Sequence, residues 1–316
     1  MRHRNSNNET LASYLISRGL NVVEAPESAD IYLAIDHTKT DRRLLEERRK
    51  LEKFSVLFRS EPKCVLPEAY KDETEALYDA VVSFGKPAGV ARSSHWPQYW
   101  LKEELLPRSD EHRSERPVMI NANKLNLSKS ELYTLRRKCV VEIGSVDLFG
   151  ESWNSNLISR LKTLLIEILK DPIRHLAAMR IHSRYWFKKW PVTIAPNNKQ
   201  EILRGYKRTL VIENDCTYMS EKLFDALIAG CIPIYVGPSV ADYGIPENLV
   251  IEVEPTVMGV ASGVEASKRI DFAAFQERLH AWLSLEATEQ SHLGSYVMER
   301  AIHEVYSEYK TFKGMD

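Results

Sequence analysis

The chemistry that this sequence could support is concentrated in one segment, 206–238. Its first part, 206–212, has a sequence typical of a strand, and this strand ends in Glu213 and Asn214. Open α/β sheets bind ligands at the carboxyl ends of their strands, which is where these two polar side chains would lie. Tyr218 follows in a short loop. This edge of the predicted sheet therefore carries groups that could hold a polar ligand.

A helix is predicted directly after this loop, at 220–230, and Glu221 and Lys222 fall in its first turn. Unpaired backbone N–H groups and the positive end of the helix dipole favour a phosphate there, and Lys222 adds a full charge. Apolar residues of the same helix recur at the spacing of a buried face, so both charged side chains can point into a crevice. An ordinary βαβ unit with a capped helix and a surface Glu–Lys pair is the simpler alternative.

Strand and helix patterns alternate along the whole chain, and the elements that they predict must position these residues. Such alternation predicts α/β architecture with mostly parallel sheets. Strands are predicted at 21–25, 29–36, 54–62, 77–86, 117–122, 206–214, 231–237 and 248–253. Helices are predicted at 11–20, 40–53, 128–143, 156–171, 220–230, 271–285 and 295–310. We expect Thr40 or Asp41 to cap the second helix and a serine to cap the third.

Two domains are predicted. A polar stretch with several prolines, 86–117, interrupts the first half, after which strand and helix patterns return and end near Gly150. We therefore expect residues 1–150 to form one Rossmann-like domain and residues 151–316 to form a second, with a βαβ unit and C-terminal helices. The second half also changes charge, from basic at 171–210 to acidic at 211–316. A local anion site is one interpretation, and a solvated charged face is the other.

The composition excludes several classes of protein. The 316 residues are 44% hydrophobic and 28% charged, an ordinary globular mixture, and the formal net charge of −1 gives no overall attraction to nucleic acid or anionic lipid. The four cysteines lack the spacing of a zinc site, and three histidines, His95, His182 and His280, are interpreted as structural. No apolar run is long enough to span a membrane and the first ten residues are polar, so we expect a cytoplasmic protein of bacterial type. The basic and aromatic run 179–190 leaves a peripheral membrane contact open.

The segment that carries the candidate chemistry resembles a known motif. YKRTLVIEN, then YMSEK, then AGCIPIYVGP resembles the donor-binding motif of the family 10 glycosyltransferases, the α1,3/α1,4-fucosyltransferases. Ser220 stands where the family usually has threonine, and Ile212 where it has phenylalanine, so the hydroxyl and the apolar character are kept. The loop Asp215–Thr217 is shorter than in the family.

The resemblance extends upstream in patches. FSVLFRSEP followed by YDAVVSFGK resembles the family's acceptor-side strands, which implies that Glu61 is the catalytic base. LRRKCVVEIGSVDLFG resembles the helix whose arginine contacts the donor diphosphate and the strand after it. Arg136 is the first choice for that arginine and Arg137 the second, because a one-residue gap would exchange them. For Glu61 alone, a solvated glutamate at a strand end is an equally good interpretation.

The resemblance implies a GT-B architecture, in which two Rossmann-like domains face each other across a cleft. It also implies an inverting enzyme that moves fucose from GDP-fucose to a glycan hydroxyl, with α1,3 linkage to GlcNAc or Glc expected. Lys222 and the arginine would stabilise the departing diphosphate without a metal, and the absence of any DxD triplet fits that expectation. Tyr218, Asn214 and Glu221 would position the donor, with Glu221 accepting from ribose hydroxyls, and Glu213 would orient the sugar.

Two other functions remain open from the sequence. An exostosin-like transferase, which uses another nucleotide sugar, also has a GCIP-type strand after its donor helix. A relative that binds a nucleotide or glycan without catalysis is favoured by the short loop Asp215–Thr217. The expected partners are in every case a nucleotide-sugar donor and an oligosaccharide or lipid-linked glycan, without cofactor or nucleic acid.

Overall fold

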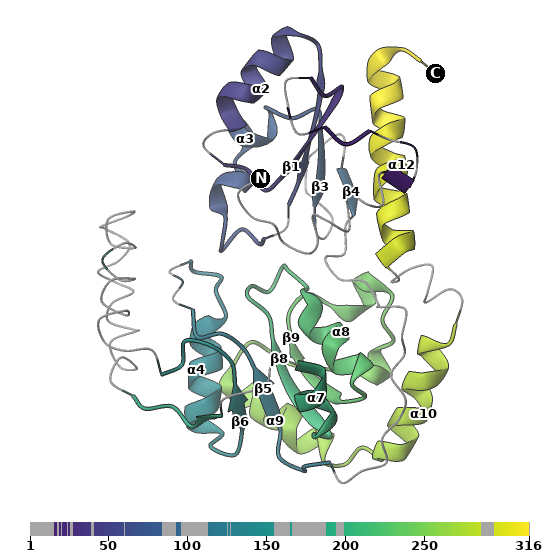
Figure 1. The fold of residues 1–316 in the computed structure, drawn as a ribbon. Helices are drawn as coiled ribbons and strands as arrows, with labels where there is room; N and C mark the ends of the chain where they lie inside the picture. Colours follow the sequence, from purple (N-terminus) through teal and green to yellow (C-terminus); the bar gives the residue numbers. More distant parts are fainter. Residues whose placement is uncertain are drawn as a thin grey trace. The chain divides into compact units, whose positions relative to one another are not determined.

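The computed structural model divides the chain into two compact units. Unit 1 comprises Met1–Lys102 and Glu286–Asp316, and unit 2 comprises Glu103–Leu285 (Figure 1). The structure describes residues 16–17, 19, 21–23, 25, 28–38, 41–59, 61–83, 93–95, 113–124, 126, 128–154, 165, 188–193, 199–285 and 294–315, with 93–95 and 294–302 described as backbone alone. Each unit is built around a parallel sheet of its own.

Unit 1 contains a four-stranded parallel sheet in the order β1-β2-β3-β4. The strands are β1 (Ile31–Ile35), β2 (Phe54–Phe58), β3 (Ala80–Ser83) and β4 (Ser93–His95). The helices of this unit are α2 (Asp41–Lys50), η1 (Pro67–Tyr70), α3 (Asp72–Glu75) and α12 (Gly294–Lys313). All five residues of β2 are buried, which is the pattern of a strand covered on both faces.

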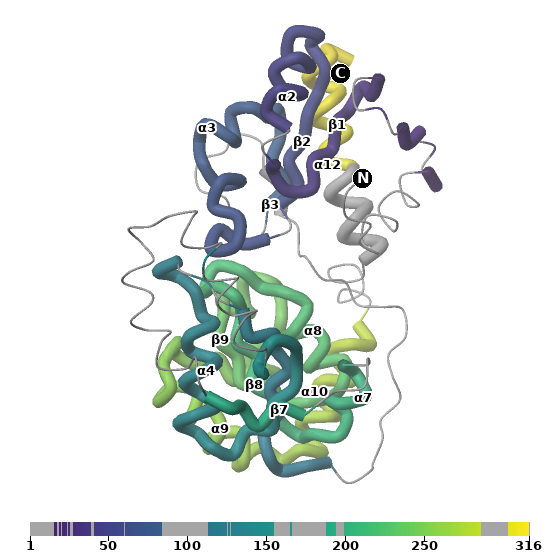
Figure 2. Tube along the Cα trace, turned by 60° about the vertical axis from the view of Figure 1, so that its left-hand side comes forward, coloured from purple at the N-terminus to yellow at the C-terminus, as the bar shows by residue number. Residues whose placement is uncertain are grey.

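The C-terminal helix α12 completes the first unit. It packs on β2, β3 and β4 although it lies about 200 residues or more further along the chain (Figures 1 and 2). The rings of Tyr309 and Phe312 lie 5.8 and 5.3 Å from the ring of Phe54. On α2, the buried Arg48 donates to the backbone carbonyls of Ala29, Asp30 and Phe54. Its charge is therefore offset by hydrogen bonds that tie the helix to the sheet.

Unit 2 contains a six-stranded parallel sheet in the order β10-β9-β8-β5-β6-β7. The strands are β5 (Val118–Ile120), β6 (Asp147–Phe149), β7 (Val192–Thr193), β8 (Arg208–Ile212), β9 (Ile232–Val236) and β10 (Ile251–Glu252). The helices are α4 (Tyr133–Glu142), α7 (Lys199–Arg204), α8 (Glu221–Ile228), η2 (Val240–Tyr243), η3 (Glu247–Leu249), α9 (Val257–Ser267) and α10 (Phe272–Leu283).

Alternate residues of β8 and β9 face opposite layers of helices. Leu210, Ile212, Ile234 and Val236 belong to one core cluster with side chains of α4 and α9. The intervening residues, among them Tyr235, point to the other face, where α8 packs on both strands (Figure 1). Strand β8 ends at the centre of the sheet, so the residues directly after it lie between two layers of helices.

The expected domain boundary near Gly150 is wrong. Strand β5 pairs with β8 and with β6, so 113–150 belong to the sheet of the second unit. The C-terminal helix α12 returns to the first unit. A division by halves misses both, because strand pairing and helix packing join segments that are distant in the chain.

Most other predicted elements are found, although α3, α7, β4 and β7 were not predicted, and there are three further differences. No serine caps α4: its N-cap is Leu132, and the side chain that accepts from an N–H of its first turn is that of Glu131, which bonds to Thr134. The residues 21–23 and 25 form no strand. Helix α9 was not predicted, since its sequence VMGVASGVEAS is rich in small residues and contains two glycines. The helices predicted at 11–20 and 156–171 lie largely outside the described residues, as do 179–187, His182 and the capping residue Thr40.

Candidate functional site

A buried ionic cluster lies where β8 ends and α8 begins. The side chain of Glu213 is fully buried, and its carboxylate accepts from the backbone N–H of Ser220 at 2.9 Å and from Ser220 Oγ at 2.6 Å. Lys222 Nζ lies 3.2 Å from Glu213 Oε2 and 2.5 Å from Ser220 Oγ. Two hydrogen bonds and the ammonium group of Lys222 thus compensate the buried negative charge of Glu213.

Local sequence explains why α8 begins here. Ser220 is the N-cap and its Oγ accepts from the backbone N–H of Lys222, while Leu223, Phe224 and Leu227 are buried against the sheet. Gly230 ends the helix with a φ of +74°, a conformation that favours glycine. Lys222 keeps 18% of its side chain exposed, so its ammonium group is held by Glu213 on a side chain that is not fully buried.

A second charged cluster flanks the first turn of α8. Lys199 Nζ, on α7, lies 3.3 Å from Glu221 Oε1 and 3.6 Å from Asp225 Oδ2. Burial alone would raise the pKa of the Glu221 carboxyl, but the charges of Lys222 and Lys199 outweigh it and lower that pKa below the ordinary value. The carboxylate of Glu221 is therefore ionised and lies between two lysines.

Arg136 links α4 to the end of β8. Its Nε and Nη2 donate to the carbonyl of Ile212 at 3.0 and 2.6 Å, and Nη2 also donates to Asn214 Oδ1 at 2.9 Å. The guanidinium group stacks over the ring of Tyr133 at 4.6 Å. This arginine is only 2% exposed, so in this structure it holds the strand end and Asn214 in place.

Arg137 holds the loop that follows β5, the strand beside β8. Its Nε donates to Asn123 Oδ1 at 2.9 Å and its Nη2 to the carbonyl of Lys124 at 2.6 Å. Like Arg136 it is buried. Both arginines therefore lie at the carboxyl edge of the sheet, and both donate hydrogen bonds to other groups of the protein.

The short loop after β8 is closed by its own side chains. Asp215 Oδ1 accepts from the backbone N–H and from Oγ1 of Thr217, at 2.8 and 2.7 Å. Tyr218 is 4% exposed, and its backbone N–H bonds to the carbonyl of Asp215. The compact turn draws Tyr218 into the interior.

Tyr235 lies beneath this cluster and was not predicted as part of it. Its Oη is buried and, among the described residues, has no hydrogen-bond partner. Burial and the charge of Glu213 raise the pKa of Tyr235 well above its ordinary value. A Cβ placed on Gly237 would come within 2.2 Å of Tyr235 Oη and 3.0 Å of Glu213 Cγ. Glycine at 237 thus allows the strand end to close over both side chains.

Glu61, the predicted base, lies in unit 1 at the carboxyl edge of that sheet. Its backbone N–H donates to Asp36 Oδ1 at 3.3 Å, and Tyr70 Oη donates to its carbonyl at 2.8 Å. His37 follows β1 at the same edge, and its Nδ1 lies 3.0 Å from Tyr78 Oη. The sequence did not single out His37, because its neighbours in the chain carry no catalytic pattern.

The structure brings together the candidate residues of the second unit and leaves Glu61 in the first. Those gathered around the end of β8 are Arg136, Arg137, Glu213, Asn214, Tyr218, Glu221 and Lys222. Lys199 was missed, because nothing in the sequence connects it with Glu221, 22 residues away. In the described part of the chain, no group of three His, Cys, Asp or Glu side chains is arranged to hold a metal ion.

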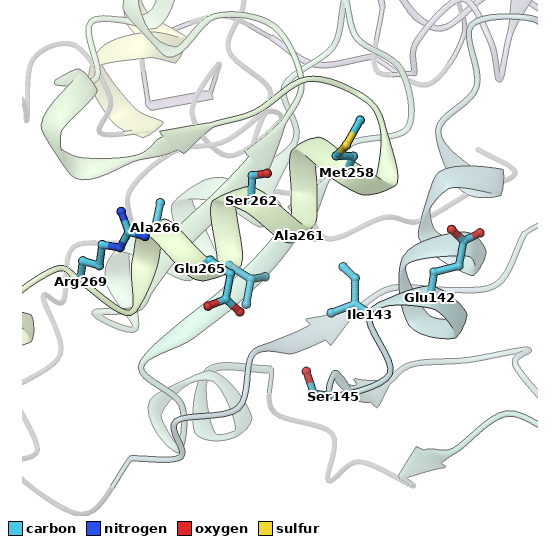
Figure 3. Close-up of a pocket in the computed structure, with 10 residues that line it drawn as sticks. Glu142, Ile143, Ser145, Met258, Ala261, Ser262, Glu265, Ala266 and Arg269 are labelled. Atoms are coloured by element: carbon cyan, nitrogen blue, oxygen red, sulfur yellow. The ribbon is translucent and has the colours of Figure 1, made fainter.

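A separate pocket of about 640 Å³ lies elsewhere on the second unit. Figure 3 shows its two walls, the end of α4 with Glu142 and Ile143 on one side and, on the other, one side of α9 from Met258 onward together with Arg269, which follows the helix. It contains none of the predicted site residues. Within the described ranges, no helix has the length and apolar character needed to cross a membrane.

A scan of protein-family models finds no match, and a search of curated proteins finds none either. Solved structures do match. An α1,3-fucosyltransferase has a TM-score of 0.52 at 12% identity, covering 96% of this chain and 86% of that one. The trehalose-6-phosphate synthase OtsA has a TM-score of 0.52 at 12% identity, covering 95% and 76%. A UDP-forming α,α-trehalose-phosphate synthase from Burkholderia xenovorans has a TM-score of 0.52 at 13% identity, covering 95% and 78%.

At these identities the likeness is one of fold. Together with the two parallel sheets, it confirms the expected fold class: the chain has the α/β fold of GT-B glycosyltransferases, with two Rossmann-like domains.

Proposed function

We propose that the protein is a glycosyltransferase that takes its sugar from a nucleotide-sugar donor bound by unit 2. The observation that carries the proposal is the cluster of Glu213, Ser220 and Lys222 at the carboxyl edge of β8. There the N-terminus of α8 and the ammonium group of Lys222 offer positive charge to the same region. Glu213 holds that ammonium group in position, so the charge is in place before a ligand arrives.

Within this class we propose GDP-fucose as the donor and a hydroxyl of an oligosaccharide or lipid-linked glycan as the acceptor, with α1,3 linkage. The support is the motif YKRTLVIEN, YMSEK and AGCIPIYVGP, in which Glu213, Glu221 and Lys222 follow the end of β8 at the carboxyl edge of the sheet. The fold, shared with an α1,3-fucosyltransferase, is compatible with this choice.

The proposed reaction is a single displacement with inversion at C1 of the sugar. Glu61 takes the proton of the acceptor hydroxyl, the oxygen attacks C1, and the C1–O bond to the diphosphate breaks so that GDP leaves with the electron pair. Lys222 and the N-terminus of α8 stabilise the negative charge that develops on the diphosphate. We propose that no metal is needed for this, since fixed cations supply the charge.

The remaining residues position the donor. Arg136 and Arg137 add positive charge at the same edge, and Arg136 also orients Asn214. Glu221 accepts hydrogen bonds from the ribose hydroxyls. Tyr218 shapes the wall of the site, and Glu213 orients the sugar through Ser220 and Lys222.

A UDP-sugar is the second candidate donor. The two trehalose-phosphate synthases reach the same TM-score as the fucosyltransferase, and the one from Burkholderia xenovorans is UDP-forming. The short turn Asp215–Thr217 also departs from the family 10 pattern. The donor base and sugar are therefore the first properties to test.

The test measures thermal stabilisation and donor hydrolysis with GDP-, UDP-, ADP- and CMP-sugars, in the presence of a chelator and with added Mg²⁺. A ligand that binds the folded state raises its melting temperature. We expect GDP and GDP-fucose alone to stabilise the protein, with or without chelator. The stabilisation should be lost in Lys222→Ala and kept in the control Lys268→Ala, which removes a lysine of a surface pair on α9. Stabilisation by UDP-sugars alone would support the second donor, and no response to any nucleotide would overturn the proposal.

A further inference from the structure

Lys199 is the first residue of α7, and it meets the first turn of α8 from the side. Its ammonium group contacts two carboxylates that lie one helical turn apart on α8, Glu221 at 3.3 Å and Asp225 at 3.6 Å. Both α7 and α8 belong to unit 2, and they pack against each other. The contact therefore fixes where the carboxylate of Glu221 points relative to the N-terminus of α8.

A second contact between the two helices supports this geometry. Gln200, next to Lys199, donates to Asp225 Oδ1 at 3.1 Å and to the backbone carbonyl of Asp225 at 3.3 Å. Asp225 is 9% exposed, so the start of α7 is anchored on a buried group. Lys199 is thereby presented to Glu221 from a fixed backbone rather than from a freely moving loop.

The pair with Glu221 contributes little to stability, because the side chains of Lys199 and Glu221 are 53% and 39% exposed and ion pairs this exposed contribute little to folding. What Lys199 contributes to folding comes mainly through Asp225, whose side chain is 13% exposed. The lysine matters more for ligand binding. A carboxylate that accepts hydrogen bonds beside a diphosphate carries a negative charge that repels the phosphates. A cation on Glu221 Oε1 reduces that repulsion and fixes the orientation of the other carboxylate oxygen.

We propose that Lys199 is a positioning residue for the donor ribose: it holds Glu221 in the orientation in which the carboxylate accepts from the 2′- and 3′-hydroxyls. The inference rests on the proposed function, in which Glu221 binds the ribose. It adds that the preference for a ribonucleotide depends on Lys199 as well as on Glu221.

The experiment compares the Kd of GDP with that of 2′,3′-dideoxy-GDP by titration calorimetry, on the full chain. Hydrogen bonds to a charged group are strong enough that the wild-type protein should prefer GDP by about tenfold or more. Lys199→Met should reduce that preference to about twofold or threefold, as expected when Glu221 loses its orientation, and Lys199→Arg should restore most of it. Lys268→Met is the matched control, because Lys268 is 51% exposed and pairs with Glu265 on a different helix.

A double-variant cycle separates a positioning role from a general effect of charge. In the Glu221→Gln background, where the preference is already lost, Lys199→Met should change it no further. If Lys199→Met weakens GDP and dideoxy-GDP equally, so that the ratio stays at the wild-type value, the inference is overturned while the proposed function stands. If wild-type protein binds neither nucleotide, the proposed function fails, and the inference fails with it.

Discussion

Among the individual residues, Glu213 constrains the candidate site most strongly, because its carboxylate is fully buried. Lys222 and Ser220 compensate its charge, and both also belong to the first turn of α8 or its cap. The proposed phosphate binding and folding therefore depend on the same contacts at this point. A change made to test the proposed phosphate site has to be separated from its effect on stability.

The first prediction concerns this coupling. Replacing Lys222 with methionine leaves Glu213 buried without its cation, and we expect a loss of about 3 kcal/mol in the free energy of unfolding. The double variant Glu213→Gln/Lys222→Met removes the uncompensated charge and should recover a large part of the loss. Urea denaturation measures both. Strictly additive effects of the two substitutions would show that the residues do not interact as described.

The hydroxyl of Tyr235 leads to a prediction of the opposite sign. Because this buried group has no hydrogen-bond partner among the described residues, Tyr235→Phe should leave stability unchanged or raise it by up to about 1 kcal/mol. Tyr206→Phe is the matched control in the same unit, since Tyr206 Oη donates to Asp147 at 3.2 Å. The control should lose about 1 kcal/mol. A clear loss of stability in Tyr235→Phe would mean that its hydroxyl does have a partner in solution.

The secondary-structure elements differ in how far the sequence alone defines them. Helix α8 was predicted with nearly its observed start and end, because Ser220, an apolar stripe and Gly230 are local signals. Helix α9 was not, because its small residues pack closely on the sheet without an amphipathic pattern: a Cβ on Gly263 would come within 2.7 Å of Ile234 and Val253.

The candidate site, like the helices, could be predicted from the sequence only where its residues lie close together in the chain. Glu213, Asn214, Glu221 and Lys222 lie close together in the chain, so their spacing could predict a shared location. The pairing of Lys199 with Glu221, and the bond from Arg136 to the end of β8, depend on how distant segments pack. The environment of Tyr235 depends on the close approach of Gly237. No local pattern encodes these contacts.

The cap of α10 provides a test at the scale of a single helix. Asp271 accepts from the backbone N–H groups of Ala273 and Ala274 at 2.9 and 3.2 Å, so Asp271→Ala should lower the free energy of unfolding by about 1 kcal/mol. Glu277→Ala removes an exposed carboxylate from the same helix without touching a cap, and should change stability little. Urea denaturation at neutral pH compares the two. Equal effects would argue against Asp271 as the N-cap.

For the whole molecule, the division of the chain determines which parts can fold together. Unit 2 contains the complete six-stranded sheet and all candidate residues except Glu61, whereas unit 1 is made from both ends of the chain. A cut at Gly150 would remove β5, which pairs with β8, and its neighbour β6, and also α4 with Arg136. The carbonyl of Ile212 and the side chain of Asn214 would then lose the partner that holds them.

The last prediction follows from that division. A fragment of residues 103–285 should unfold cooperatively in urea, because it is the whole of unit 2. It should also bind GDP with an affinity close to that of the full chain, since it keeps every described contact among Glu213, Ser220 and Lys222. The fragment 151–316 should not unfold cooperatively. It lacks two adjacent strands of its sheet, β5 and β6, and it carries α12 without β2, β3 and β4, on which that helix packs. Tryptophan fluorescence and calorimetry on both fragments make the comparison. Cooperative unfolding of 151–316, or a lack of it in 103–285, would contradict the division of the chain into these two units. A folded 103–285 that does not bind GDP would contradict the proposal that unit 2 alone binds the donor.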